Sequence, residues 1–346
     1  MSAVESAEAT AEPEGASHPR LLSDLGGGWW RPLLGLLLAG LVVVVLAVGV
    51  LLVAALSAGV AGSPSDSSGS AGSAVDDALA PSTPLGLLTN NLIIAAFVPA
   101  AVVAVLVVHR THPGWLVSVQ RRVRLQLLGV LLALALAVTG GFFLAGFLLP
   151  GSTGTSGDLS VPTTGTLVGL LLVIALTTPL QAAAEEVAFR GYLSQAVASW
   201  FTRPAVGIAA AALVSSALFA LAHGGQDAAL FGDRLAFGLV ASWLAWRTGG
   251  LEAPVALHVA NNLVSLAYSA VVGSLEASLD ASTLPWQYLA LDVAMMLVFA
   301  GLAVRVARAR GEATHRVLSA AAGVGYPWRR LSTPPPAGNE EPWGMG

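Results

Sequence analysis

The stretch GTLVGLLLVIALTTPLQAAAEEVAFRGYLSQAVASW, residues 165–200, decides the fold. It is longer than the roughly 20 apolar residues that a helix needs to cross a bilayer. Two adjacent acids, Glu185 and Glu186, lie inside it together with Arg190. A carboxylate at mid-bilayer costs about 2.5–3.5 kcal/mol even on the lenient scale from insertion experiments. Two acids in one span therefore indicate a polar chamber that is lined by protein and has a function.

The composition places this stretch in a membrane protein with several spans. Of the 346 residues, 55% are hydrophobic and only 10% are charged, which is too apolar for a soluble domain of this size. We predict an all-α polytopic fold with about eight transmembrane helices, of which the sixth is short. The predicted spans are 31–58, 90–108, 125–149, 165–199, 205–230, 234–247, 251–273 and 286–306.

Arginine placement predicts the orientation, because positive residues in short loops stay in the cytosol. The loops at 59–89, 150–164 and 274–285 contain acids but no Lys or Arg. We therefore expect a multi-pass protein of the cell (plasma) membrane with both termini cytosolic. The acidic leader shows no convincing cleavage site, so the first span is expected to be an anchor.

The chain divides into a membrane domain and two polar tails. Residues 1–28 and 311–346 are rich in polar residues, Gly and Pro, and both are expected to be disordered cytosolic tails. Residues 29–310 form the predicted transmembrane domain. The chain has no cysteine, which excludes disulfides and a cysteine nucleophile. No basic patch points to nucleic acid, so the expected partners are membrane lipids and a protein or peptide substrate.

Three short patterns in the second half of the chain carry the chemical signal. They are EEVAFR at 185–190, FALAH at 219–223 and HVANN at 258–262. Singly, each pattern is as well explained by helix packing as by a site. Three patterns on three helices favour a site, and we expect a chamber among the fourth, fifth and seventh helices.

Helix geometry gives the residues of the first pattern different roles. Glu186 and Arg190 are four residues apart, share a face and are expected to pair. Glu185 points elsewhere and has no such partner. An unpaired carboxylate in an apolar site is suited to act as a general base.

The second and third patterns supply histidines and an amide. His258 and Asn262 are also four residues apart, and both can donate hydrogen bonds to a developing oxyanion. His223 ends the fifth span, and Phe219 lies one turn earlier as a packing residue. Straight, flush helices would hold these groups at different depths. They meet if the hairpin between the fourth and fifth spans projects by about two turns.

The three patterns resemble those of the CPBP family, which comprises CAAX prenyl proteases and bacteriocin-processing enzymes (the Abi domain). The family pattern is EExxxR, then FxxxH, then HxxxN, and the resemblance covers residues 165–273. It implies an intramembrane endopeptidase with eight helices. Glu185 and His223 would activate water, and His258 and Asn262 would bind the oxyanion. Glu186 and Arg190 would shape the site.

The resemblance leaves open whether catalysis requires a metal, because the family has been described both as metal-dependent and as using glutamate alone. Glu185, His223 and His258 are compatible with zinc. However, the chain has no HExxH, and adjacent glutamates are awkward joint ligands. We therefore favour the glutamate mechanism without a cofactor.

Two other functions fit the same residues. An ion- or proton-coupled transporter could use the Glu/His/Arg cluster as a relay, although the chain shows no inverted repeat. An inert scaffold or immunity member of the family is the third reading, and the complete set of motifs argues against it. Asp292 in the last span is expected to be a structural partner or an interfacial residue.

Overall fold

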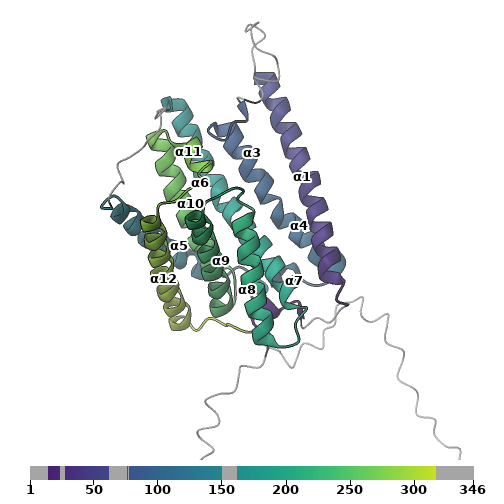
Figure 1. Cartoon of the computed structure of the whole chain (residues 1–346). Helices are drawn as coiled ribbons and strands as arrows, with labels where there is room; N and C mark the ends of the chain where they lie inside the picture. The colour runs from purple at the N-terminus through teal and green to yellow at the C-terminus, as the bar shows by residue number, and fades with distance from the viewer. Residues whose placement is uncertain (1–14, 24–27, 62–75, 77, 150–161, 317–346) are drawn as a thin grey trace, which may run out of the picture. The chain divides into compact units, whose positions relative to one another are not determined.

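The computed structural model describes residues 15–23, 28–61, 76, 78–149 and 162–316. Apart from two isolated β-bridges, the regular structure of these residues is entirely helical (Figure 1). Residues Ala16–Arg316 form one compact unit. It contains every feature discussed below.

Eight helices of the described residues are long and apolar enough to cross a membrane, which confirms the predicted all-α polytopic fold. Their bounds are Arg31–Gly59, Pro84–His109, Leu125–Gly146, Thr164–Ala198, Pro204–Leu221, Ala228–Thr248, Glu252–Val272 and Trp286–Ala309. Five of these are single α-helices: α5 (Leu125–Gly146), α8 (Pro204–Leu221), α9 (Ala228–Thr248), α10 (Glu252–Val272) and α12 (Trp286–Ala309). The first span lies within α1 (Arg31–Ala61).

Proline divides the second span. It consists of α3 (Pro84–Ala95), α4 (Phe97–Ala104) and the π-helix η4 (Val105–His109). Pro99 lies in the first turn of α4, where its ring would clash with the carbonyl four residues earlier if one helix ran through. That carbonyl belongs to Ala95, the last residue of α3. The break at Ala96 therefore has a local cause.

The fourth span is unusually long. It comprises α6 (Thr164–Glu186), the π-helix η6 (Val187–Leu193) and α7 (Ser194–Ala198), 35 residues in all. At 1.5 Å per residue this is about 50 Å, against a hydrocarbon core of about 30 Å. The length agrees with a hairpin that projects well beyond the apolar layer.

The fifth and sixth spans differ from the predicted ones. The prediction extended the fifth span to residue 230, but α8 ends at Leu221 because Gly224 takes a left-handed conformation with φ of 81°. Asp227 then caps α9 by accepting a hydrogen bond from the amide of Leu230 at 2.8 Å. The sixth span is consequently a full 21 residues, and the prediction that it is short was wrong.

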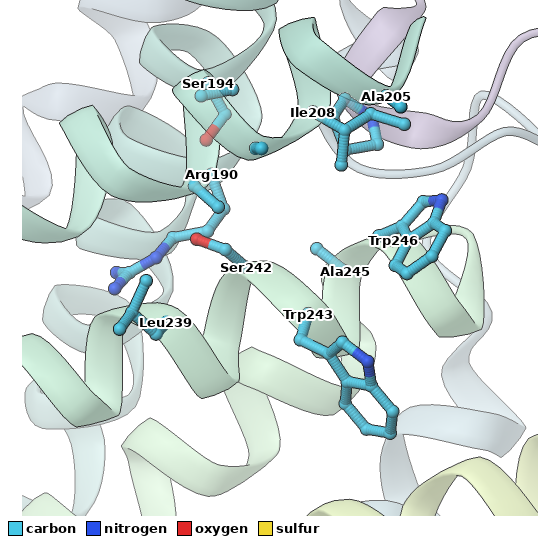
Figure 2. Close-up of a pocket in the computed structure, with 13 residues that line it drawn as sticks. Arg190, Ser194, Ala205, Ile208, Leu239, Ser242, Trp243, Ala245 and Trp246 are labelled. Carbon is cyan, nitrogen blue, oxygen red and sulfur yellow. The ribbon is translucent and has the colours of Figure 1, made fainter.

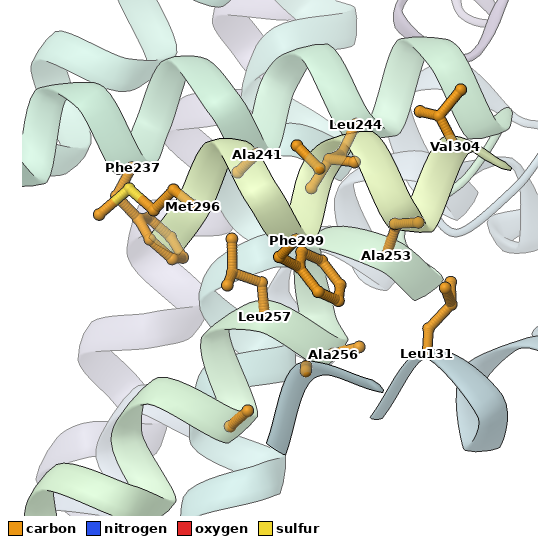
Figure 3. Close-up of a cluster of buried hydrophobic side chains, with 14 of the residues drawn as sticks. Leu131, Phe237, Ala241, Leu244, Ala253, Ala256, Leu257, Met296, Phe299 and Val304 are labelled. Atoms are coloured by element: carbon orange, nitrogen blue, oxygen red, sulfur yellow. The ribbon is translucent and has the colours of Figure 1, made fainter. Parts of the chain in front are cut away.

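The main core joins α5, α9, α10 and α12. Figure 3 shows Leu131, Phe237, Leu257, Met296 and Phe299 packed together, all of them buried. Buried alanines fill the rest of this core, at positions 135, 241, 253, 256, 260, 300 and 303. Lipid is as apolar as a protein core, so membrane helices associate through close van der Waals packing, which small residues permit.

The backbones of α8 and α9 come closest at a glycine. A Cβ added to Gly238 would lie 2.6 Å from the Cβ of Ser216, so any larger residue would push the two helices apart. Helix α10 contacts both α5 and α6, and α9 contacts α8 and α12. Helix α10 also contacts α9, so the fourth, fifth, sixth and seventh spans pack as one group.

The N-terminal segment, residues 15–23, lies in the tail that was expected to be disordered, and that expectation does not hold for it. Leu21 is buried against Trp115 and Val119, and His18 is completely buried. Arg20 donates hydrogen bonds to the carbonyls of Ala198 and Phe201, at 3.3 and 2.8 Å. Its charge thus stabilises the C-terminal end of α7.

The two ends of the compact unit meet. Ser17 and His315 form an antiparallel bridge, and the amide of Arg316 donates to the carbonyl of Ala16 at 2.9 Å. Residues 311–316 are therefore packed, although the prediction counted them in the disordered C-terminal tail.

A buried ion pair holds the starts of α5 and α10 together. Arg124 lies 2.6 Å from Glu252, and both side chains are almost completely buried. Glu312 approaches the other side of the guanidinium at 3.4 Å. Glu252 is a buried acid outside the three motifs, so the motifs do not hold every buried acid of the second half.

Candidate active site

The first motif spans a change of helix type. Glu185 and Glu186 end α6, and Arg190 lies in the π-helix η6 that follows. A π-turn is wider than an α-turn and is frequent at functional sites. Glycine at 191 permits the close packing here, because a Cβ there would lie 2.8 Å from the carbonyl oxygen of Leu116.

Glu186 is the centre of the hydrogen-bond network. Its Oε1 accepts from Arg190 Nη1 at 3.0 Å and from His258 Nδ1 at 2.8 Å, and the side chain is completely buried. The predicted pair of Glu186 and Arg190 is therefore present. The carboxylate also holds the histidine of the third motif, which its sequence spacing did not predict.

Aromatic rings surround the rest of Arg190. The guanidinium carbon lies 4.5 Å from the centre of the Phe219 ring and 5.7 Å from that of Phe237. Its Nε and Nη2 have no hydrogen-bond partner, so the π faces supply the remaining favourable electrostatics. Phe219 also makes an edge contact with His258, at 5.9 Å between ring centres. It therefore packs between the motifs.

Glu185 has a partner, contrary to the prediction. Its Oε1 accepts a hydrogen bond from Gln181 Nε2 at 2.8 Å. Its Oε2 has no hydrogen bond, is buried, and faces His258 Nε2 at 3.5 Å. His258 Nδ1 already donates to Glu186. A proton between His258 Nε2 and Glu185 Oε2 would make the contact between these two atoms favourable. Glu185 and His258 thus form a pair suited to share a proton.

Asn262 joins the site through the same glutamine. Its Nδ2 donates to Gln181 Oε1 at 3.2 Å, so Gln181 bridges Asn262 and Glu185. The sequence analysis missed Gln181. The available signal was its position, since it is a lone amide in an apolar span, four residues before Glu185 and on the same helical face.

His223 lies at the edge of the site. In the described part of the chain no hydrogen bond or ion pair joins it to the residues of the first and third motifs. Its ring is in edge contact with Phe219 at 4.8 Å between centres, and its Nδ1 donates to the Phe219 carbonyl at 2.8 Å. Partial desolvation lowers the pKa of His223, which favours the neutral ring with Nε2 free to accept a proton.

The proposed zinc ligands do not gather into one cluster. Among the described residues, no three His, Asp or Glu side chains are grouped so that they could hold a metal ion. Glu185 and His258 face one another, but His223 does not complete a set with them. The donor arrangement therefore does not fit a three-residue zinc site.

A separate cavity of about 400 Å³ lies between α8 and α9 (Figure 2). Its walls are mostly apolar and include Trp243, Trp246 and Pro19 of the N-terminal segment. Arg190 also lines it, but Nε and Nη2 are buried, so the cavity meets the stem of this side chain. Neither Glu185 nor His258 lines this cavity.

Two further charged residues lie near the N-terminal end of α9. Asp233 and Arg234 are in its second turn, where the predicted span of 234–247 began at Arg234 and left Asp233 outside. Asp292 on α12 acts electrostatically on Asp233. This interaction makes Asp292 a neighbour of another acid and not an isolated charge.

The comparisons with known proteins agree with the motifs. One family model, described as Type II CAAX prenyl endopeptidase Rce1-like, matches residues 166–264. No curated protein and no solved structure matches the chain. The matched residues contain all three motifs and confirm the resemblance to CAAX proteases. At the level of the family, the match supports a CAAX-type intramembrane endopeptidase. Residues 166–264 therefore carry the sequence pattern of the Rce1-like type II CAAX prenyl endopeptidases.

Proposed function

We propose that this protein hydrolyses a peptide bond of a membrane-associated protein or peptide with a water molecule activated by Glu185. The observation that carries the proposal is the facing pair of Glu185 Oε2 and His258 Nε2 at 3.5 Å, with Glu186 holding the far side of the histidine at 2.8 Å. A base, a donor and a carboxylate that orients the donor are the parts that acyl transfer to water requires.

The proposal gives each proton a direction. Glu186 accepts from His258 Nδ1, so Nε2 of the same ring is directed toward Glu185 and can carry the proton offered to the substrate. In the proposed step Glu185 takes a proton from water. The hydroxide adds to the carbonyl carbon, and His258 Nε2–H, with the second N–H of Asn262, stabilises the oxyanion.

Collapse of the tetrahedral intermediate completes the reaction. The carbon–nitrogen bond breaks, and the proton taken from water passes to the departing amine, so water is divided between the two products. His223, neutral and free at Nε2, is placed at the edge of the site to assist this transfer. Glu186 and Arg190 act as positioning residues, because their contacts orient His258.

We place the enzyme in the plasma membrane with both termini in the cytosol, on the arginine distribution of its loops. In this orientation the turn between α7 and α8 is cytosolic, and the extra length of the fourth span is expected to project there.

The test is a cleavage assay with purified protein in lipid vesicles. The substrates are a prenylated peptide ending in a CAAX sequence and its unmodified copy, followed by mass spectrometry. We expect cleavage by the wild type and a loss of at least 10³-fold in Glu185→Gln, because the amide keeps the shape but takes no proton from water. Glu276→Gln, on exposed α11 (Leu275–Leu279), is the matched control and should retain full activity.

Two results would count against this function. Full activity of Glu185→Gln would remove Glu185 as the base. Intact peptides together with Glu185-dependent ion flux into the vesicles would favour a transporter.

The same samples decide the metal question. In the glutamate mechanism, exhaustive chelation leaves activity intact, and the purified protein carries well under one equivalent of zinc. Stoichiometric zinc, with activity lost on its removal and regained on its return, would instead make Glu185, His223 and His258 the ligands.

A further inference from the structure

Arg234 is an arginine within a membrane-spanning helix that forms no ion pair with any described residue. Its one hydrogen bond runs from Nη1 to the neutral amide oxygen of Gln226, at 2.7 Å. A guanidinium has five N–H donors, so most of its capacity is unused here. An arginine in a span is rare and normally marks a function.

Gln226 ties this arginine to the end of α8. Its Nε2 donates to the carbonyl of Ala220 at 2.6 Å, and the backbone amide of His223 donates to the same carbonyl at 3.3 Å. Arg234, through Gln226, and the backbone amide of His223 are therefore both connected to the carbonyl of Ala220. The positive charge of Arg234 and the negative charge of Glu185 both act on the His223 ring.

The turn beside these residues is open. His223, Gly224 and Gly225 are exposed, and a Cβ added to either glycine would meet no atom within 4 Å. Two glycines thus leave free volume next to the exposed imidazole. The nearest competing charge is Asp233, which acts on Arg234 but makes no ion pair with it, and Asp292 acts in turn on Asp233.

We propose that Arg234 binds a carboxylate of the peptide substrate at the open turn formed by residues 223–226. A carboxylate matches the planar fork of a guanidinium, and the open turn at Gly224 and Gly225 follows His223 at the edge of the candidate site. The carboxylate is either the C-terminal one, a few residues beyond the scissile bond, or that of an acidic side chain there. This inference rests on the proposed function and specifies which substrates it favours.

The test uses three versions of one peptide that differ only at the last residue. The first ends in a free carboxylate, the second in an amide, and the third in an amide with glutamate as its last residue. Binding is measured by fluorescence anisotropy with Glu185→Gln protein, which leaves the peptide intact. Turnover is measured with protein that retains Glu185.

We expect tighter binding and a lower KM for a carboxylate-bearing peptide than for the plain amide, by about tenfold. Arg234→Gln should remove this preference. It should weaken binding of the carboxylate-bearing peptides and leave binding of the plain amide peptide unchanged. Arg234→Lys should retain most of it. Asp233→Asn is the matched control, and it should keep the preference because it alters the neighbouring charge without touching the guanidinium.

The possible outcomes separate the two proposals. If the wild type treats all three peptides alike, or if Arg234→Gln weakens all three equally, Arg234 has no carboxylate-binding role while hydrolysis stands. If the free acid and the glutamate amide differ, the preferred one identifies the source of the carboxylate. If no peptide is bound or cleaved, both proposals fail for this class of substrate.

Discussion

Glu186 accepts hydrogen bonds from Arg190 and His258 with a single buried oxygen, so in the proposed mechanism one carboxylate serves both stability and catalysis. We expect Glu186→Gln to destabilise the protein by about 3 kcal/mol or more, because it leaves the Arg190 charge buried without its counter-ion. Activity should fall as well, since the amide orients His258 less firmly. Thermal unfolding in detergent and the peptide assay measure the two effects.

Glu312→Gln is the matched control for this change. Glu312 also pairs with a buried arginine, Arg124, but at 3.4 Å and with a partly exposed side chain. Arg124 moreover keeps Glu252 as its main partner. The control should cost about 1 kcal/mol or less. Equal losses in the two variants would show that the Glu186 carboxylate has no special structural role.

Among the elements, the N-terminal segment is expected to make the stability of the protein depend on mildly acidic pH. His18 Nε2 donates to the carbonyl of Leu116 at 3.1 Å, and burial lowers the pKa of His18 from 6.5 to about 4. Above pH 6.5 the ring is neutral in both folded and unfolded states. As the pH falls from 6.5 to 4, the unfolded chain takes up a proton that the folded one does not, so stability decreases.

The expected loss from this histidine is about 3 kcal/mol by pH 4. Melting temperatures of the wild type and His18→Gln between pH 7.5 and 4.5 should converge as the pH falls, because the variant lacks this titration. His112→Gln, at an exposed histidine outside this segment, is the variant for comparison. A constant difference between the wild type and His18→Gln at every pH would contradict the assignment.

Several elements were predictable from the sequence, and the reasons are local. Runs of apolar residues located the eight spans, because each run is long enough to cross the apolar layer of a bilayer. The end of α8 was missed because the small and apolar residues after Leu221 continue the apolar composition. Only the glycine turn, with Gly224 in the left-handed region, ends the helix.

The residues of the candidate site were predictable in part, with Gln181 missed and His223 outside the network, and the network itself was not predictable. The i,i+4 rule predicted the pair of Glu186 and Arg190, because both residues are on one helix. The contacts of His258 with both glutamates, and the bridge from Gln181 to Asn262, join α6 to α10. Helical periodicity describes one helix at a time, so contacts between helices require the packing of the whole unit.

At the scale of the whole molecule, the arginine distribution predicts the orientation in the membrane. Ser278 on α11 and Thr202 in the turn between α7 and α8 are both exposed, and the chain has no cysteine of its own. A membrane-impermeant thiol reagent added to intact cells should label Ser278→Cys and not Thr202→Cys. Permeabilised cells, in which both should react, provide the control. Labelling of Thr202→Cys alone would invert the topology.

The meeting of the two ends of the compact unit has a mechanical consequence. The bridge between Ser17 and His315 lies where the two tails join the folded chain, so tension between the tails reaches this bridge before any membrane span. Pro19, two residues after Ser17, lies in the wall of the cavity beside Arg190. Its neighbours His18 and Arg20 keep their own hydrogen bonds to Leu116, Ala198 and Phe201, so the bridge can open without releasing this wall.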